Sequence, residues 1–203
     1  MNTRHILTII ALTLCLAACM GKPTRPSQFY LLSPDPGQPV AARATANSPL
    51  SIGLGPVTLP EIYDRPQIVT RSGSNQIILA QFDRWGGDLN KELSRTLARN
   101  LMSRLNTDSV ALYPWSGRYK PDFQVTIRIF RLDGKLDEAV TLDGVWRLLD
   151  GNNGCELAAQ RFEYQEHTTG PGYPELVDAM SRGVARLSQQ IAEEVASSQP
   201  GCE

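Results

Sequence analysis

The chain has 203 residues, with 20 Lys and Arg side chains against 21 Asp and Glu, so its formal net charge at pH 7 is −1. This balance argues against a nucleic-acid binder, which should carry a basic excess or stripe, and the length suits one ordinary domain with its own core. The only histidines are His5 and His167, and no Cys-x-x-Cys or His-x-x-x-His spacing occurs. We therefore expect neither a metal site nor a cofactor.

The first residues are typical of an export signal. After Arg4, the apolar run 6–18 is shorter than the roughly 20 residues that a spanning helix needs, but it suits a secretory signal peptide. The run ends in "LAAC" at Cys19, which resembles the lipobox of bacterial lipoproteins, where the cysteine is acylated with fatty acids such as palmitate. We expect a signal peptide at 1–18, a lipidated tether at 19–28 and a single domain at 29–203.

The residue after the acylated cysteine bears on the destination of the chain. In Gram-negative lipoproteins an Asp at this position usually retains the protein in the inner membrane. Here the residue is Met20. The resemblance therefore implies the outer membrane, with the domain anchored on the periplasmic face.

Two further cysteines, Cys155 and Cys202, remain in the exported chain. Because an extracytoplasmic compartment favours oxidation, we predict a disulfide between them. Chain-entropy estimates give about 4 kcal/mol for closing a loop of this size. The alternative is a pair of unrelated thiols, and the geometry decides between the two.

The first half of the domain contains strand signals followed by a helix. A short strand is expected at 29–32, a Pro- and Ala-rich loop at 33–49, and a strand at 50–59 that Gly55 and Pro56 interrupt. Residues 66–82 indicate a hairpin that turns at 72–75. From Leu89 to Leu105 leucines recur every fourth residue behind Asp88, a pattern typical of an amphipathic helix with its N-cap.

The second half begins with alternating apolar and polar residues. Three runs, 122–134, 139–150 and 155–167, are separated by short polar links and predict an antiparallel meander with one buried face that holds Trp146. A second amphipathic helix follows, with Pro174 in its first turn. We predict an α+β fold: a mixed, mainly antiparallel sheet of roughly five to seven strands with two amphipathic helices packed on one face.

Four stretches together resemble a known family. The segments "FYLL" (29–32), "YDRPQIVTR" (63–71), "RWGGDLNKELSRTLARNL" (84–101) and "LDGVWRLLD" (142–150) look like the ABC-type transport auxiliary lipoproteins, which include the lipoprotein subunit of the paraquat-inducible Pqi system. The likeness covers nearly the whole exported chain in order. One departure is Trp85-Gly86-Gly87-Asp88-Leu89, where the family pattern is Trp-Ala-x-Pro-Leu.

The resemblance implies a non-catalytic transport subunit. Such a protein would dock a periplasmic MCE-domain protein at the outer membrane and so support envelope integrity, while inner-membrane transport components would be reached only indirectly. Contact with an MCE tube would favour several copies in a homo-oligomeric ring. Lipids or other hydrophobic molecules would be the cargo.

Partner-contact candidates are Tyr63, Arg65 and Trp85, because amphipathic aromatic residues and Arg are favoured at interfaces and these three lie near predicted loops. The alternative is local: Trp85 would close the helix end and Arg65 would brace a turn.

Two other functions compete with docking. One is an assembly lipoprotein that works beside an outer-membrane β-barrel. The other is a hydrolase, for which His167 is the only possible histidine base in the exported chain. No Gly-x-Ser-x-Gly nucleophile elbow accompanies it.

Overall fold

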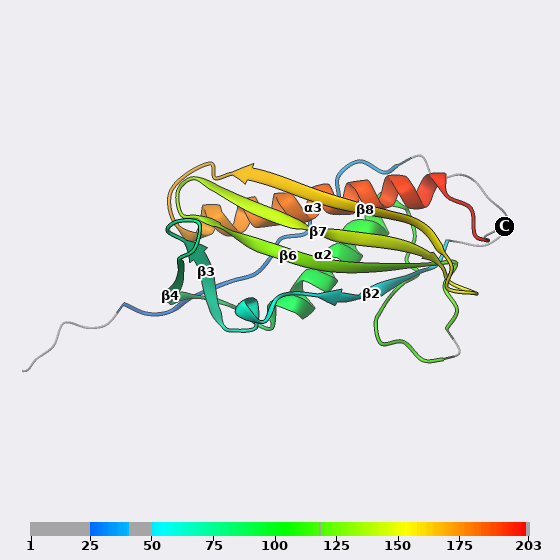
Figure 1. The fold of residues 1–203 in the computed structure, drawn as a ribbon, viewed down its shortest axis with the longest axis horizontal. Coiled ribbons are helices and arrows are strands. Elements are labelled where there is room, and N and C mark those ends of the chain that lie inside the picture. The colour runs from blue at the N-terminus through cyan, green and yellow to red at the C-terminus, as the bar shows by residue number, and fades with distance from the viewer. Residues whose placement is uncertain (1–24, 41–49, 118, 202–203) are drawn as a thin grey trace, which may run out of the picture.

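The computed structural model describes residues 25–40, 50–117 and 119–201. The predicted signal peptide, Cys19 and Cys202 lie outside these ranges. The described chain is elongated and is built from two β-sheets and two long helices (Figure 1). Within the described ranges no helix is long and apolar enough to cross a membrane.

Five strands form the large sheet, in the order β5-β2-β6-β7-β8. β2 runs parallel to both of its neighbours, whereas β6, β7 and β8 form the antiparallel meander that the sequence predicts. β2 continues through Pro56, although its register with β6 shifts between Leu54 and Val57. The strands are Val110–Leu112 (β5), Ile52–Thr58 (β2), Phe123–Lys135 (β6), Ala139–Asp150 (β7) and Glu156–His167 (β8).

A separate small sheet has the strand order β1-β4-β3. It consists of Gln28–Tyr30 (β1), Ile77–Trp85 (β4) and Gln67–Arg71 (β3), with β1 parallel and β3 antiparallel to β4. The expectation of one continuous sheet is therefore corrected. The short helix η1, Glu61–Tyr63, turns the chain after β2, so the β3–β4 hairpin pairs with the N-terminal strand instead of extending the large sheet.

Both helices pack against each other and against one face of the large sheet, as predicted (Figure 1). Helix α2 spans Leu89–Arg104 and helix α3 spans Tyr173–Ser197. The leucine stripe of α2 is buried, and Trp146 on β7 is 1% exposed in the same core. The α+β class and the helix faces predicted from the sequence are thus confirmed.

The segment that follows β1 crosses the helix layer. We call residues 33–40 the strap; it contains no helix or strand, in agreement with the predicted loop. The backbone N–H of Asp35 donates to Asn100 Oδ1 on α2 at 2.9 Å, and Asn100 Nδ2 donates to Ser188 Oγ on α3 at 3.1 Å. Because Asn100 is fully buried, its satisfied amide ties the strap to both helices.

Candidate docking pocket

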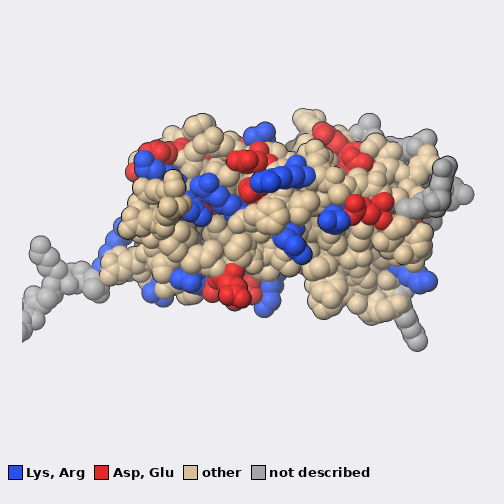
Figure 2. Space-filling model, in the orientation of Figure 1, with Lys and Arg blue, Asp and Glu red and all other residues tan. Residues whose placement is uncertain are grey.

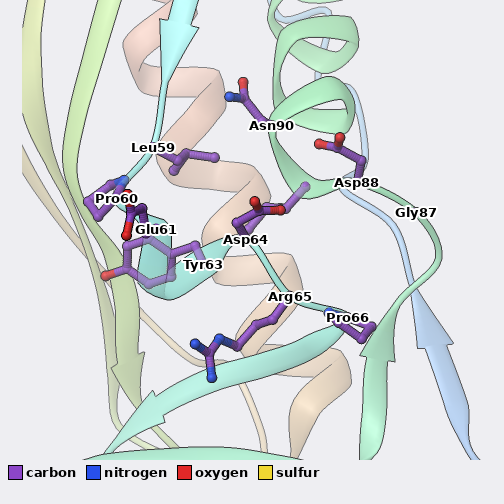
Figure 3. A pocket seen from close by; sticks show the side chains of 11 residues that line it. Leu59, Pro60, Glu61, Tyr63, Asp64, Arg65, Pro66, Gly87, Asp88 and Asn90 are labelled. Carbon is purple, nitrogen blue, oxygen red and sulfur yellow. The ribbon is translucent and has the colours of Figure 1, made fainter.

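A pocket of about 490 Å³ opens between the loop after β2 and the N-terminus of α2 (Figure 3). Tyr63 and Arg65, two of the three residues proposed from the sequence, line it. The third, Trp85, lies directly before the turn that forms the opposite wall. The lining residues are Leu59, Pro60, Glu61, Tyr63, Asp64, Arg65, Pro66, Gly87, Asp88, Leu89 and Asn90.

Backbone hydrogen bonds fix the loop that forms one wall of the pocket. The N–H of Tyr63 donates to Pro60 O at 3.0 Å and closes the single turn of η1. The N–H of Trp85 then donates to Pro66 O at 2.7 Å. This last bond holds the two walls together at the base of the pocket.

The opposite wall is the capped start of α2. Asp88 is the N-cap residue, and its Oδ1 accepts a hydrogen bond from the backbone N–H of Lys91 at 3.0 Å. That N–H holds the pKa of the Asp88 carboxyl below its usual value. The wall is therefore anionic at neutral pH and keeps a fixed geometry.

Tyr63 lines the pocket, but its hydroxyl bonds to groups in the interior. The hydroxyl donates to Asp133 Oδ2 at 2.8 Å and accepts the backbone N–H of Leu132 at 3.2 Å. Burial is the main cause that raises the pKa of Tyr63 to about 12. Since the side chain is 4% exposed, the structure favours a role inside the domain over contact with a partner.

Asp133 is a residue that the sequence analysis missed. It is 1% exposed on β6, and it receives Arg71 Nε from β3 and Arg131 Nε from β6, both at 2.7 Å. The carboxylate therefore joins the small sheet to the large one through charge-assisted hydrogen bonds. A strand that alternates apolar and polar residues gives no sign that one acid faces inward.

Trp85 ends β4 opposite Tyr30 of β1 and is 5% exposed. Its burial again favours a local role. The first of the two glycines that follow it has a structural reason: a Cβ added at Gly86 would lie 2.9 Å from Leu31 Cδ2, whereas one added at Gly87 would meet nothing within 4 Å. The turn that departs from the family pattern thus makes room for the chain after β1.

Arg65 is the sequence candidate that keeps part of its side chain exposed. Its Nε is buried, with no hydrogen-bond partner among the residues that the structure describes. In Figure 3 the side chain of Arg65 extends away from α2, whereas Asp64 lies toward α2. Of the three candidates, Arg65 is the one whose placement suits contact with a partner.

An aromatic cluster lies in the loop between β5 and β6, away from the pocket. The ring of Trp115 meets those of Tyr113 and Tyr119 edge-on, at centroid distances of 5.7 and 6.1 Å. Trp115 also packs on β2, where a Cβ at Gly53 would lie 2.6 Å from its ring. The sequence gave no signal that these three rings would meet.

The remaining sequence candidates have the following places. His167 is exposed at the end of β8, opposite Ala139. Cys155 directly precedes β8, whereas its predicted partner, Cys202, is outside the described residues. Within residues 25–40, 50–117 and 119–201, no group of three or more His, Cys, Asp or Glu side chains is arranged to hold a metal ion.

Comparison with known proteins gives a clear match for most of the chain. The family profile described as "ABC-type transport auxiliary lipoprotein component" matches residues 30–192. The chain is also 27% identical over 139 residues to the intermembrane transport lipoprotein PqiC of Escherichia coli K12, covering 68% of this chain and 71% of that protein. PqiC of Shigella flexneri matches to the same extent.

Solved structures share the fold. A crystal structure of an uncharacterized protein superposes with a TM-score of 0.68 at 20% identity, covering 84% of this chain and 99% of the other. A protein from Xanthomonas campestris gives a TM-score of 0.65 at 15% identity, covering 84% and 95%. At these identities the likeness establishes the architecture alone.

Proposed function

Because the chain belongs to the family of ABC-type transport auxiliary lipoprotein components, we propose that it docks a periplasmic MCE-domain protein at the outer membrane. It is an auxiliary lipoprotein of an intermembrane transport system and, in this proposal, has no catalytic role. Lipids or other hydrophobic molecules would pass through the MCE protein to or from inner-membrane transport components. Docking would support envelope integrity by holding that route in place.

The proposed anchor is Cys19, acylated after removal of residues 1–18. Residues 19–28 would form the tether and residues 29–203 the docking domain, of which 30–192 match the family profile. Met20 in place of Asp supports the outer membrane as the destination. Acyl chains contribute about 0.8 kcal/mol per buried CH₂, so multiple acylation gives a lasting attachment.

The proposed docking contact is the pocket rim at Arg65. Its guanidinium can form several hydrogen bonds in a planar arrangement, which suits carboxylates and carbonyl groups of a protein partner. The rigid walls on either side, fixed by η1 and the N-cap of α2, would meet the partner with little loss of entropy. Several copies around an MCE tube would form the proposed ring.

The proposed disulfide between Cys155 and Cys202 would secure the C-terminal end of the chain. The backbone N–H of Gly201, which precedes Cys202, donates to Asp150 Oδ2 at 2.7 Å. Asp150 N donates in turn to Cys155 O at 2.9 Å. These bonds bring the residue before Cys202 to the turn that holds Cys155, which supports the pairing; non-reducing peptide mapping tests it.

The family match carries the proposal, and crosslinking in the native envelope tests it. Tagged, lipidated protein is crosslinked and purified beside Cys19→Ala, Arg65→Ala and Arg128→Ala forms, and co-purifying proteins are identified by mass spectrometry. Arg128 is the matched control because it is an exposed Arg on the large sheet. We expect an MCE-domain protein with the wild type and the control, and about fivefold less with Arg65→Ala, equivalent to ~1 kcal/mol.

Other outcomes would contradict docking. Recovery of a β-barrel without an MCE protein would favour the assembly lipoprotein. Ester or amide hydrolysis that disappears in His167→Ala would favour the hydrolase. If Arg65→Ala recovers as much MCE protein as the wild type, the docking contact lies elsewhere on the domain.

A further inference from the structure

Exposed apolar side chains gather at one sheet of this molecule. Among the described residues, seven large hydrophobic side chains are exposed, and four of them belong to the small sheet or directly follow its first strand. Phe29 and Leu31 are 67% and 57% exposed, and Ile78 and Leu79 on β4 are 46% and 41% exposed. Ile78 and Leu79 are neighbours on a strand and project to opposite faces. We therefore restrict the name anchor-end patch to Phe29 and Leu31.

Local geometry keeps Phe29 and Leu31 outward. They are two residues apart on an extended segment, so their side chains project to the same side. Phe29 lies opposite Arg84 in the β1–β4 register, while Tyr30 between them turns inward and donates its hydroxyl to Asp83 Oδ1 at 2.8 Å. The inward contacts of Tyr30 fix the register, which leaves its two neighbours facing solvent.

The position of the patch along the chain favours a lipid surface as its occupant. Phe29 is the tenth residue after Cys19, and an extended chain of ten residues spans at most about 35 Å. A domain held by acyl chains at Cys19 must therefore keep β1 near the membrane. In Figure 1 the chain enters at the end of the molecule that holds β3 and β4, so the whole patch lies at the tethered end.

The charges around the patch suit an anionic bilayer. Arg25 is exposed in the tether, and the partly exposed Arg84 is the β4 residue that pairs with Phe29. Basic side chains close to an apolar patch are attracted to acidic phospholipid headgroups while the apolar groups enter the interface. Figure 2 shows blue, basic atoms where the described chain begins, whereas the red, acidic atoms of this end lie at its upper edge.

We infer that the anchor-end patch contacts the phospholipid surface of the membrane that holds the acyl chains, and so fixes how the domain stands on it. The inference rests on the lipid anchor at Cys19 proposed above. A tether alone lets the domain rotate freely; two contacts, one covalent and one apolar, restrict its orientation. The opposite end, with the loop between β5 and β6, then points away from the bilayer.

Site-specific photocrosslinking to lipid tests this orientation. The photoreactive residue benzoylphenylalanine replaces Phe29, Tyr113 or Phe130 in turn, and each lipidated chain is reconstituted in vesicles of phosphatidylethanolamine and phosphatidylglycerol. Tyr113 and Phe130 are matched controls, because they are aromatic residues that are 57% and 45% exposed outside the small sheet. We expect at least about fivefold more lipid adduct, measured by mass spectrometry, at position 29 than at either control.

Each alternative outcome overturns the inference in a recognisable way. Equal lipid labelling at the three positions would mean that the domain has no preferred orientation. Crosslinks from position 29 to another protein chain, and not to lipid, would assign the patch to a protein partner. If the chain does not sediment with the vesicles at all, the anchor at Cys19 fails as well, whereas bound protein without adduct at position 29 overturns the patch alone.

Discussion

The two sheets present opposite kinds of surface. On the large sheet the face away from the helices carries exposed Arg128, Arg147 and Arg161, and Figure 2 shows basic and acidic side chains side by side across it. Arg161 Nη2 lies 3.5 Å from Asp143 Oδ1 within this face. The small sheet instead exposes the anchor-end patch. A sheet face that meets water is usually polar, and the inferred contact of the anchor-end patch with a phospholipid surface would account for the contrast.

The two faces of the large sheet also differ, and removing one side chain from each face should show the largest difference in stability. Trp146→Ala should destabilise the protein by about 4 kcal/mol, because it empties a large buried site and removes the bond from Trp146 Nε1 to Gln190 Oε1. Urea unfolding measures the change. Val145→Ala, one residue away on the opposite face, is the control and should cost less than about 1 kcal/mol. Equal costs would mean that both faces are packed.

The junction between the sheets depends on Asp133. Asp133→Asn should cost roughly 2–3 kcal/mol, because Arg71 and Arg131 lose their common anionic partner in a buried position. The unfolding transition of the pure variant gives the value. Asp143→Asn, whose partner Arg161 is largely exposed, is the matched control and should change stability by less than about 0.5 kcal/mol. If Asp133→Asn also changes stability by less than about 0.5 kcal/mol, packing alone joins the sheets.

Ionisation of Tyr63, at this junction, should lower the stability of the fold at alkaline pH. Burial raises the pKa of Tyr63 from its ordinary value of 10.0 to about 12, so the folded state holds the phenol proton more tightly than the unfolded chain. Its contribution is full below pH 10 and is lost as the pH rises toward 12. Between pH 10 and 12 the free energy of unfolding should therefore fall by roughly 1–2 kcal/mol more in the wild type than in Tyr63→Phe.

Fluorescence-monitored unfolding at a series of pH values checks this prediction. The wild type and Tyr63→Phe are compared between pH 9 and 12 in steps of about half a unit. Parallel curves for the two proteins would mean that Tyr63 does not set the limit. Tyr30, whose pKa is also raised to about 12 by burial, would then be the next residue to test.

The smallest stability change is expected on the small sheet, and it separates surface from core. Phe29→Ser combined with Leu31→Ser should shift the free energy of unfolding by less than about 0.5 kcal/mol, because both side chains are mostly in solvent. Thermal unfolding measures it. A loss of several kcal/mol would show that these side chains stabilise the domain itself, and the comparison between the two sheets would lose its basis.

Local patterns were sufficient for much of the fold. The fourfold leucine spacing behind Asp88 predicted α2, which spans Leu89–Arg104 with Asp88 as its cap. The alternating residues of the meander predicted three antiparallel strands and the burial of Trp146. These features depend on periodicity and capping, which are properties of neighbouring residues and can be read along the chain.

Only the tertiary structure decided which of the candidate residues are surface and which are interior. Tyr63 and Trp85 have the composition of interface residues, yet one is held by Asp133 and the other lies in the register of β1 and β4. Their partners are 70 and 55 positions away along the chain, Asp133 and Tyr30. Pairings over such separations are set by how β1 and η1 divide the strands into two sheets. Sequence periodicity carries no record of that choice, because it reports the face of each element and not the element that covers it.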